Sequence, residues 1–566
     1  MRIGLLTDGG YPYATGELRL WCERLVRGLP DHEFDVHALV RDPRQERAGL
    51  VGLPPQVRRV RTARLWEPVD GGRAHGRRDR HRFAEHFAQL AHSLCHSLGD
   101  EGAESFAAGL YGLAELAGER GGLPAALRSE RALRILESAC RAPGARRGVR
   151  AAAVPDHLAF ARAVEQALRP LSLDWYGAGG AADDREAEDS WEGARAGGLA
   201  AADICHATTA GAAALPGLLA KRFFGTPLLV TEYGVGLRAH YLATDGARED
   251  ALRAPLRSLL AAFHGRLAAE VYRAAHLVTP GNAHARRWQE QCGADRAKLR
   301  TIHPGLAADR FAEVGESDDA GDPDTLVWTG RIEPAKDLLS LLHAFAEIRR
   351  RRPGTRLRVV GAPAPGDEGH AYLAHCRTLA AQLFPDEAPG AYAVGENPVS
   401  FEEAGGPEAP EPADAYAGAG VAVLSSSVEG FPLSLVEAML CGRATVSTDV
   451  GAVVEVVGGT GLVVPPHNPK ALADACLGLL ADDDRRRRLG AAARSRALEL
   501  FTVEQNVAAF RAAYLDVLSH SPGRPAPPAP GAPLPFAGAA ETGVPVRWAG
   551  PAARETAGAG AGSRDV

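Results

Sequence analysis

The sequence predicts an α/β protein made of two Rossmann-like domains, with a helical insertion in the first. Its 566 residues are enough for two such domains and an insertion. Residues 1–40 read as strand, loop, helix and strand, and strand-like and helix-like segments alternate again over residues 325–500. Because strands that alternate with helices pair in parallel, both regions predict a parallel sheet covered by helices.

The composition is that of an ordinary globular protein, with 46% hydrophobic residues and a formal net charge of −6. This mild charge argues against a nucleic-acid-binding protein. The eight cysteines show no C-x-x-C or Cys/His spacing, so we expect reduced thiols, no bound metal and a cytoplasmic protein. Residues 1–8 read as a strand and not as a signal peptide, and residues 198–220 are too polar to span a membrane.

The first domain is expected to cover residues 1–306. A strand at Ile3–Thr7 leads into a glycine-rich loop over residues 8–16, an amphipathic helix at Glu17–Gly28 and a second strand at Phe34–Val40. The loop lacks the G-x-G-x-x-G pattern, so no dinucleotide cofactor is indicated.

Residues 82–199 are rich in Ala, Leu, Glu and Arg at helical spacing, which predicts the helical insertion. The basic run over residues 73–82 suits an anionic acceptor, a peripheral membrane contact or a membrane protein, but we expect an ordinary solvated loop. Residues 203–211 and 227–238 each read as a buried strand with a polar turn at its carboxyl end, where open α/β sheets bind ligands.

The second domain is expected to cover residues 325–500, after a polar linker over residues 307–324. Besides the helix of its central motif, it is expected to have helices at residues 337–351, 371–383, 469–480 and 484–500. Residues 501–519 predict a closing helix that returns to the first domain. Residues 520–566 are rich in Pro, Ala and Gly, so a disordered tail is expected there.

The centre of the second domain is a strand, a tight turn and a helix over residues 421–439. Pro432 suits the first helical turn, where its missing N–H costs nothing. Glu429 lies in the turn. Glu437 lies on the helix, and its side chain leans toward the N-terminus of the helix and therefore toward the same turn. Two carboxylates there accept hydrogen bonds from vicinal hydroxyls, such as those of a pyranose and a ribose.

Two cations follow another strand of this domain. Arg331 and Lys336 lie where that strand ends and a helix begins, a setting that stabilises a diphosphate. Lysine is rare in this chain, which makes a lysine at such a position informative. The chain has only four: Lys221, Lys298, Lys336 and Lys470.

The spacing Glu429, seven residues, Glu437, followed by Ala-Met and Gly442, resembles the donor site of retaining glycosyltransferases of the family 4 type. These enzymes have the GT-B fold, in which two Rossmann-like domains face each other across a cleft. In the first domain, Tyr11-Pro12 and Trp21, with the turns at residues 206–211 and 231–234, resemble a bacterial subgroup typified by the transferase of Pel exopolysaccharide synthesis.

The resemblance implies metal-independent transfer of a hexose from a nucleotide sugar such as UDP-glucose to a glycan, a lipid-linked or a small-molecule acceptor, as in polysaccharide biosynthesis. It assigns Arg331 and Lys336 to the leaving diphosphate, Glu429 to the donor sugar and Glu437 to the ribose. The backbone near the donor would come from Gly430, Phe431, Pro432 and Leu433. The acceptor would be bound by Gly10, Gly16, His206, Glu232 and Arg238.

Three positions depart from that subgroup, which usually has glycine, histidine and asparagine where this chain has Glu17, Tyr233 and Pro304. Three alternatives therefore stay open: an active glycosyltransferase, a weakened homologue that binds a sugar nucleotide as a partner subunit, and a GT-B enzyme of another reaction, such as an epimerase. The sequence carries no signal for the oligomeric state.

Overall fold

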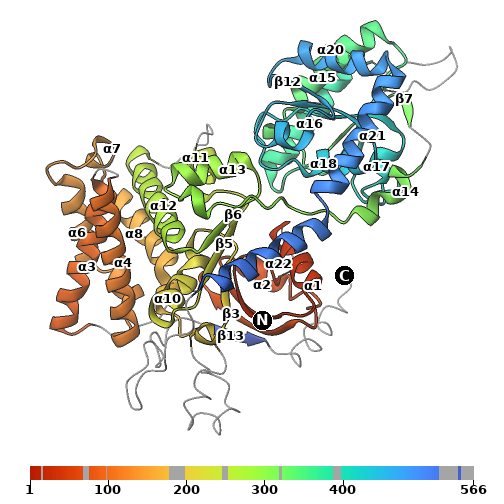
Figure 1. Ribbon diagram of the computed structural model, residues 1–566. Coiled ribbons are helices and arrows are strands. Elements are labelled where there is room, and N and C mark those ends of the chain that lie inside the picture. The colour runs from red at the N-terminus through yellow and green to blue at the C-terminus, as the bar shows by residue number, and fades with distance from the viewer. Residues whose placement is uncertain are drawn as a thin grey trace, which may run out of the picture. The chain divides into compact units, whose positions relative to one another are not determined.

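The computed structural model describes residues 1–13, 17–67, 75–96, 99–176, 198–244, 253–317, 321–385, 397–521 and 546–549. The chain forms two compact units (Figure 1). The first comprises Met1–Pro280, Ala285–Thr301 and Ala509–Val566, and the second comprises Gly281–His284 and Ile302–Ala508. The predicted linker over residues 307–324 holds two short helices and the start of a strand, because this part of the chain is built into the second unit.

The first unit contains a seven-stranded sheet in the order β13-β3-β2-β1-β4-β5-β6. Six of its strands run parallel, in the Rossmann order that the opening of the chain predicts. Its strands are β1 (Arg2–Asp8), β2 (Glu33–Val40), β3 (Val57–Arg64), β4 (Ile204–Ala207), β5 (Leu228–Glu232), β6 (Leu277–Pro280) and β13 (Val546–Ala549).

The predicted helical insertion is present, as the group of helices drawn in orange in Figure 1. It begins at Arg77, so part of the basic run that we expected in a loop is helical. The reason is that Phe83, Phe87, Leu90 and Leu94 recur at helical spacing and are buried, which leaves the arginines on the other face. The helices of this unit are α1 (Glu17–Gly28), α2 (Pro43–Arg47), α3 (Arg77–Cys95), α4 (Asp100–Arg120), α5 (Leu123–Leu127), α6 (Glu130–Arg141), α7 (Arg147–Arg150), α8 (Val154–Leu168), α10 (Leu215–Phe224), α11 (Gly236–Thr244), α12 (Ala254–Ala274) and α13 (Ala283–Gln291), with short 3₁₀ turns η1 (Arg169–Ser172), η2 (Leu199–Ala201), η3 (Ala212–Ala214) and η4 (Arg296–Lys298).

The second unit contains a six-stranded parallel sheet in the order β12-β11-β10-β7-β8-β9. Successive residues of one strand belong to different cores: Leu326 and Trp328 pack in one cluster and Val327 packs in another. Helices therefore cover both faces of the sheet, as the near-continuous apolar strands predict. The strands are β7 (Asp322–Thr329), β8 (Arg356–Val360), β9 (Val399–Glu402), β10 (Ala419–Leu424), β11 (Ala444–Thr448) and β12 (Leu462–Val464).

The helices of the second unit lie close to their predicted positions. They are α14 (Ala312–Gly315), α15 (Leu338–Arg351), α16 (Asp367–Leu383), α17 (Asp414–Ala417), α18 (Leu433–Leu440), α19 (Val453–Val457), α20 (Pro469–Leu480), α21 (Asp483–Leu500) and α22 (Val503–Ser519), with 3₁₀ turns η5 (Ala308–Phe311) and η6 (Pro334–Lys336). The closing helix α22 starts in the second unit, and its residues from Ala509 onward belong to the first.

The six parallel strands of the first sheet have the same order as the strands of the second sheet when each set is numbered from its own first strand. In both sheets the strand order reverses between two central strands. The reversal lies between β1 and β4 in the first unit and between β7 and β10 in the second. Open parallel sheets bind ligands outside the carboxyl ends of the strands at this point. The segments that follow β7 and β10 carry Arg331, Lys336 and Glu429.

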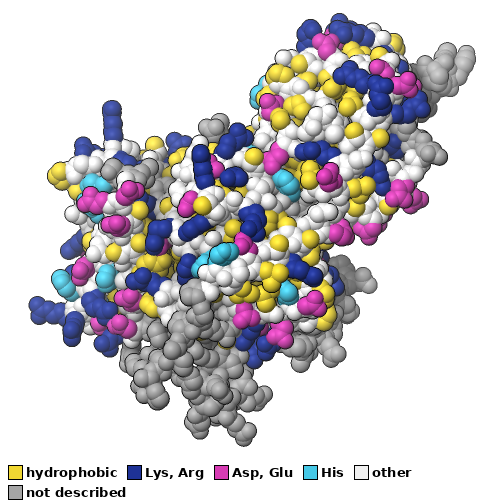
Figure 2. Space-filling view, in the orientation of Figure 1, with side chains coloured by type: hydrophobic (Ala, Val, Ile, Leu, Met, Phe, Trp, Pro, Cys, Tyr) yellow, Lys and Arg dark blue, Asp and Glu magenta, His cyan; other side chains and the backbone are white. Residues whose placement is uncertain are grey.

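On the face drawn in Figure 2, basic and acidic side chains are intermingled over both units. No helix among the described residues is long and apolar enough to cross a membrane.

The predicted disordered tail lies mostly outside the described residues. Four of its residues form β13, which pairs antiparallel with β3 at the edge of the first sheet. The expectation of disorder is wrong for this short segment, because an open sheet edge offers backbone partners to any extended chain.

We expect that a chain ending at Ser521 keeps its melting temperature within about 2 °C, because four backbone-paired residues at a sheet edge contribute little. Removing α22 as well should lower it strongly, since Phe510 and Tyr514 are fully buried. Differential scanning fluorimetry of both truncations measures this. A loss of several degrees from the first truncation alone would show that β13 is a structural strand.

Candidate functional site

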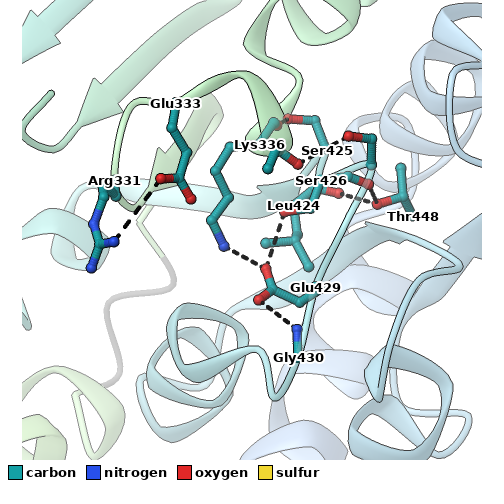
Figure 3. A network of polar contacts seen from close by, with 11 residues as sticks. Arg331, Glu333, Lys336, Leu424, Ser425, Ser426, Glu429, Gly430 and Thr448 are labelled. Atoms are coloured by element: carbon teal, nitrogen blue, oxygen red, sulfur yellow. Dashed lines mark hydrogen bonds and ion pairs between the residues drawn. The ribbon is translucent and has the colours of Figure 1, made fainter. Parts of the chain in front are cut away.

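Lys336 and Glu429 form an ion pair at the strand reversal of the second unit. Lys336 Nζ lies 2.5 Å from Glu429 Oε2, and the two side chains are only 19% and 10% exposed. The carboxylate also accepts hydrogen bonds from Ser426 Oγ at 3.2 Å and from Gly430 N at 3.0 Å (Figure 3). Two residues predicted for one site therefore touch each other, and the position of the carboxylate is fixed by three donors.

The two loops that carry this pair are tied together by hydrogen bonds between η6 and the segment after β10. Ser425 Oγ donates to Lys336 O at 2.8 Å, and Ser427 N donates to Ala335 O at 2.9 Å. Thr448 Oγ1, at the end of β11, donates to Ser426 O at 2.6 Å. The serines were not predicted as site residues, although three in succession at the end of a buried strand were the signal for them.

Arg331 lies on the same loop as Lys336, directly after β7. Its side chain is 56% exposed, and its Nη1 lies 4.0 Å from Glu333 Oε2. In Figure 3 the side chains of Arg331 and Lys336 extend to the same side of the loop. An exposed guanidinium beside a part-buried ammonium is suited to an anionic group that approaches from solvent.

Glu437 lies on α18, about one turn from its start, and contacts a buried tyrosine. Tyr416 OH lies 3.0 Å from Glu437 Oε2, 2.9 Å from Ser434 O and 2.5 Å from Thr329 Oγ1. Burial raises the pKa of Tyr416 well above its usual value, so the hydroxyl stays protonated and can donate. Tyr416 was missed because it lies on the four-residue helix α17, which follows a segment rich in Gly, Pro and Glu and belongs to no motif.

We expect Tyr416→Phe to weaken nucleotide binding about three- to tenfold, because Glu437 loses a hydrogen bond worth about 1 kcal/mol that fixes its position. Isothermal titration with the preferred nucleotide measures the affinity, and thermal unfolding of the same sample separates binding from folding. Tyr111→Phe is the matched control, because Tyr111 is a buried tyrosine of the first unit that also donates to a glutamate, Glu270, at 2.6 Å. Equal affinities of Tyr416→Phe and the wild type would show that Glu437 is held by other contacts.

The turn before α18 is close to the predicted one, but the helix begins at Leu433 and Pro432 is its N-cap. Phe431 packs against the rings of His303 and Phe501, with centroids 6.1 and 5.7 Å away. Gly451 allows the turn to approach closely, because a Cβ there would lie 2.4 Å from Glu429 O. The backbone from Gly430 to Leu433 is thus held in place by packing from three other segments.

The glycine-rich loop of the first unit follows β1. Gly9 and Gly10 both have φ of 70°, which favours glycine, and a Cβ on Gly9 would lie 2.8 Å from Gln45 Nε2. Gly9 N donates to Leu39 O at 2.9 Å, so the loop lies beside the carboxyl end of β2. Gly16 lies outside the described residues, and so does the side chain of Glu17.

His206 was predicted to face the acceptor, but the structure buries it inside β4. Its Nδ1 lies 2.7 Å from Tyr514 OH and its Nε2 lies 2.7 Å from Thr231 Oγ1, so both ring nitrogens have protein partners. Burial lowers the pKa of His206 to about 3, which keeps the ring neutral. Trp21 and Phe510 pack beside the ring. In this structure His206 is a fully buried core residue.

Glu232 is also buried, at the carboxyl end of β5. Its carboxylate accepts hydrogen bonds from Tyr272 OH and from the backbone N–H groups of Ala210 and Gly236. Burial raises the pKa of Glu232, and these hydrogen bonds oppose that shift. Its role in the structure is to hold the turn into α11, on which the half-buried Arg238 lies.

No three His, Cys, Asp or Glu side chains of the described residues gather in a way that could hold a metal ion. The arrangement in the second unit instead combines two cations with two carboxylates at the end of a parallel sheet. It can bind a molecule that presents both phosphate oxygens and hydroxyl groups.

Comparison with known proteins identifies this part of the chain. Residues 323–482 match the family model described as glycosyl transferases group 1. The second unit is thus similar to group 1 glycosyltransferases over these residues. Residues 1–171 and 193–297, in the first unit of this glycosyltransferase homologue, match a domain of unknown function, DUF3492.

Relatives with a curated name point the same way. The chain is 34% identical over 218 residues to a D-inositol 3-phosphate glycosyltransferase of Nocardia farcinica, a match that covers 36% of this chain and 45% of the relative. It is 29% identical over 317 residues to the enzyme of the same name from Kribbella flavida, covering 52% and 68%. This glycosyltransferase homologue thus spans about half the length of the first of these relatives.

Solved structures show the fold. The chain resembles the Anabaena protein HepE in complex with UDP with a TM-score of 0.52 and 14% identity, over 91% of this chain and all of the other. It resembles sucrose-phosphate synthase of Thermosynechococcus elongatus with a TM-score of 0.52 and 17% identity, over 92% and 100%. The fold of the glycosyltransferase homologue is therefore GT-B, as the sequence predicts.

Proposed function

We propose that this protein is a retaining, metal-independent glycosyltransferase that moves a hexose from a nucleotide sugar of the UDP-glucose kind to a glycan, lipid-linked or small-molecule acceptor. The observation that carries the proposal is the Lys336–Glu429 pair, which lies at the strand reversal of a domain that matches group 1 glycosyltransferases. The Pel-type subgroup is part of this proposal, on the strength of the first-domain residues that resemble it.

The ion pair explains how one site can bind both the diphosphate and the sugar of the donor. In the absence of donor, Lys336 and Glu429 neutralise each other at 2.5 Å. When a nucleotide sugar binds, its diphosphate competes for Lys336, and sugar hydroxyls replace the ammonium as donors to Glu429. Arg331 supplies a second cation to the diphosphate, so that negative charge on the departing nucleotide is stabilised by side chains.

Glu437 and Tyr416 would hold the ribose, because the fixed carboxylate of Glu437 accepts hydrogen bonds from vicinal hydroxyls. The acceptor would be bound by the first unit, where Gly10 and Arg238 remain candidates and the buried His206 and Glu232 act by holding the neighbouring turns. The named activity of the relatives suggests an acceptor that carries a phosphate or several hydroxyl groups.

Incubation of the full chain with UDP-, GDP- and ADP-sugars, followed by mass spectrometry of released nucleotide and thermal shift, tests the proposal. We expect one nucleotide sugar to stabilise the protein and to be turned over in the presence of EDTA. Binding without turnover would favour a weakened homologue, and a changed sugar still attached to its nucleotide would favour an epimerase. Activity that disappears with EDTA and returns with manganese would contradict the metal-independent mechanism.

A further inference from the structure

The first unit contains a cavity of about 400 Å³ that none of the predicted donor or acceptor residues line. It lies among the start of α4, the helices α11 and α12, and the end of α13. Its volume is within the range of pockets that bind small molecules. The helical insertion contributes α4 to it, so the cavity exists only because that insertion packs on α12.

The shape of the cavity comes from small residues on one face of α12. Ala261, Gly265 and Ala269 follow one another at intervals of four residues, so they lie one above another on that face. Gly293 lies directly against this face, because a Cβ there would lie 3.6 Å from the Cβ of Ala269. The absence of larger side chains on α12 therefore keeps the space open.

One carboxylate in the cavity is already neutralised. Glu270 accepts two hydrogen bonds from Arg273, at 2.8 and 2.6 Å, and one from Tyr111 OH at 2.6 Å. Three donors satisfy most of the capacity of this carboxylate. The Arg273–Glu270 pair therefore adds little net charge to the cavity.

Two further guanidinium groups line the same space. Arg266 is only 6% exposed, and its Nη1 donates to the neutral carbonyl of Gly99 at 3.2 Å. Arg146 Nη2 donates to the carbonyl of Leu94 at 2.5 Å. Burial and the neighbouring charge of Arg146 lower the pKa of Arg266, and the charge of Asp100 opposes this shift. With three arginines and two carboxylates among its lining residues, the cavity has a positive charge.

The rim of the cavity carries an exposed aromatic ring. Tyr241, on α11, lines the cavity and is 51% exposed. A large ring that is apolar on its face and polar at its hydroxyl suits a ligand with both kinds of surface, such as a pyranose.

We propose that this cavity is an accessory binding site for a saccharide unit that carries an anionic group, either a carboxylate or a phosphate. The guanidinium groups of Arg146 and Arg266 would hold the anion, and Tyr241 would pack against the sugar ring. The assignment rests on the proposed function, because saccharides are the molecules that the proposed reaction handles. The site binds the saccharide without taking part in the transfer.

Isothermal titration of the full-length protein, without any nucleotide sugar, tests this with four probes: glucuronate, glucose 6-phosphate, glucose and inorganic phosphate. We expect one of the first two to bind at least about tenfold more tightly than glucose or phosphate. Which of the two binds more tightly tells a uronate from a sugar phosphate. The proposal would be overturned if phosphate or glucose bound as tightly as the better of the two charged sugars. It would also be overturned if neither charged sugar bound.

Two variants locate the binding. Arg146→Gln removes the charge but keeps a polar side chain, and Ala269→Leu fills the cavity without changing any charge. We expect each to weaken binding at least about tenfold. Arg147→Gln, on the exposed neighbour of Arg146 that does not line the cavity, should bind as the wild type does. Normal binding by a folded Ala269→Leu variant would place the ligand elsewhere.

The same titration with Lys336→Ala keeps the two proposals apart. That variant lacks the proposed diphosphate contact but has an intact cavity, so it should bind the charged sugar as the wild type does. If the protein does not turn over any donor, the charged sugar can still bind in the cavity. If the charged sugar does not bind, the protein can still turn over its donor.

Discussion

Lys336→Ala should lower the turnover number about thirty- to a thousandfold and change donor affinity less, because its contact with the departing diphosphate strengthens as the bond breaks. One such contact is worth about 2 to 4 kcal/mol of the barrier. The variant also leaves Glu429, which is 10% exposed, without its cation, and this lowers the rate further if the carboxylate orients the donor sugar. Steady-state kinetics with the donor found in the panel, together with nucleotide titration, separate the two effects.

The matched control is Lys470→Ala, because Lys470 is a lysine of the same unit that is 79% exposed and pairs with Asp474 on the surface of α20. It should keep the wild-type rate. A Lys336→Ala enzyme as active as this control would rule out the proposed role of Lys336 at the diphosphate.

Gly361→Ala should lower the melting temperature by about 3 to 10 °C and reduce activity with it. A Cβ at this position would lie 1.9 Å from the carbonyl oxygen of Gly330, a backbone atom that cannot rotate away. Overpacking of this kind costs about 1 to 3 kcal/mol. The loop that would have to move carries Arg331, and it is held by Ile332 N donating to Ala362 O at 2.8 Å.

Gly354→Ala is the control for this substitution, because it lies near the other end of β8 and a Cβ there meets no atom within 4 Å. Thermal unfolding and donor turnover of both variants should differ clearly. If Gly361→Ala unfolds at the wild-type temperature, the two loops are not packed as closely as the structure shows.

Most of the second unit could be predicted from the sequence, because its local signals agree with its fold. The helix at Pro469–Leu480 has proline in its first turn and a cap at Asn468, and its bounds match the prediction. In the first unit, β3 was not predicted, because residues 57–64 contain four arginines and lack the apolar run of a buried strand. Arg61 is nevertheless buried, since Asp174, 113 residues further on, lies 2.6 Å away and pairs with it.

The candidate site was partly predictable, because some of its residues also follow local sequence signals. Glu429 and Lys336 were found because each lies just after a buried strand, where parallel sheets bind ligands. Their direct pairing, and the contact of Tyr416 with Glu437, depend on side chains that are 93 and 21 residues apart in the chain. His206 was misjudged because its partner Tyr514 lies 308 residues further on, where nothing local points to it.

The separation of 308 residues between His206 and Tyr514 in the chain affects how the protein folds during translation. The core of the first unit is incomplete until the ribosome has added Phe510 and Tyr514, because these two residues cover Trp21 and His206. During translation the whole second unit therefore emerges while the first still exposes part of its interior. Exposed core surface of this kind is what chaperones recognise and what aggregates at high concentration. All residues of the second unit are therefore made before the first unit can reach its native state, which depends on α22.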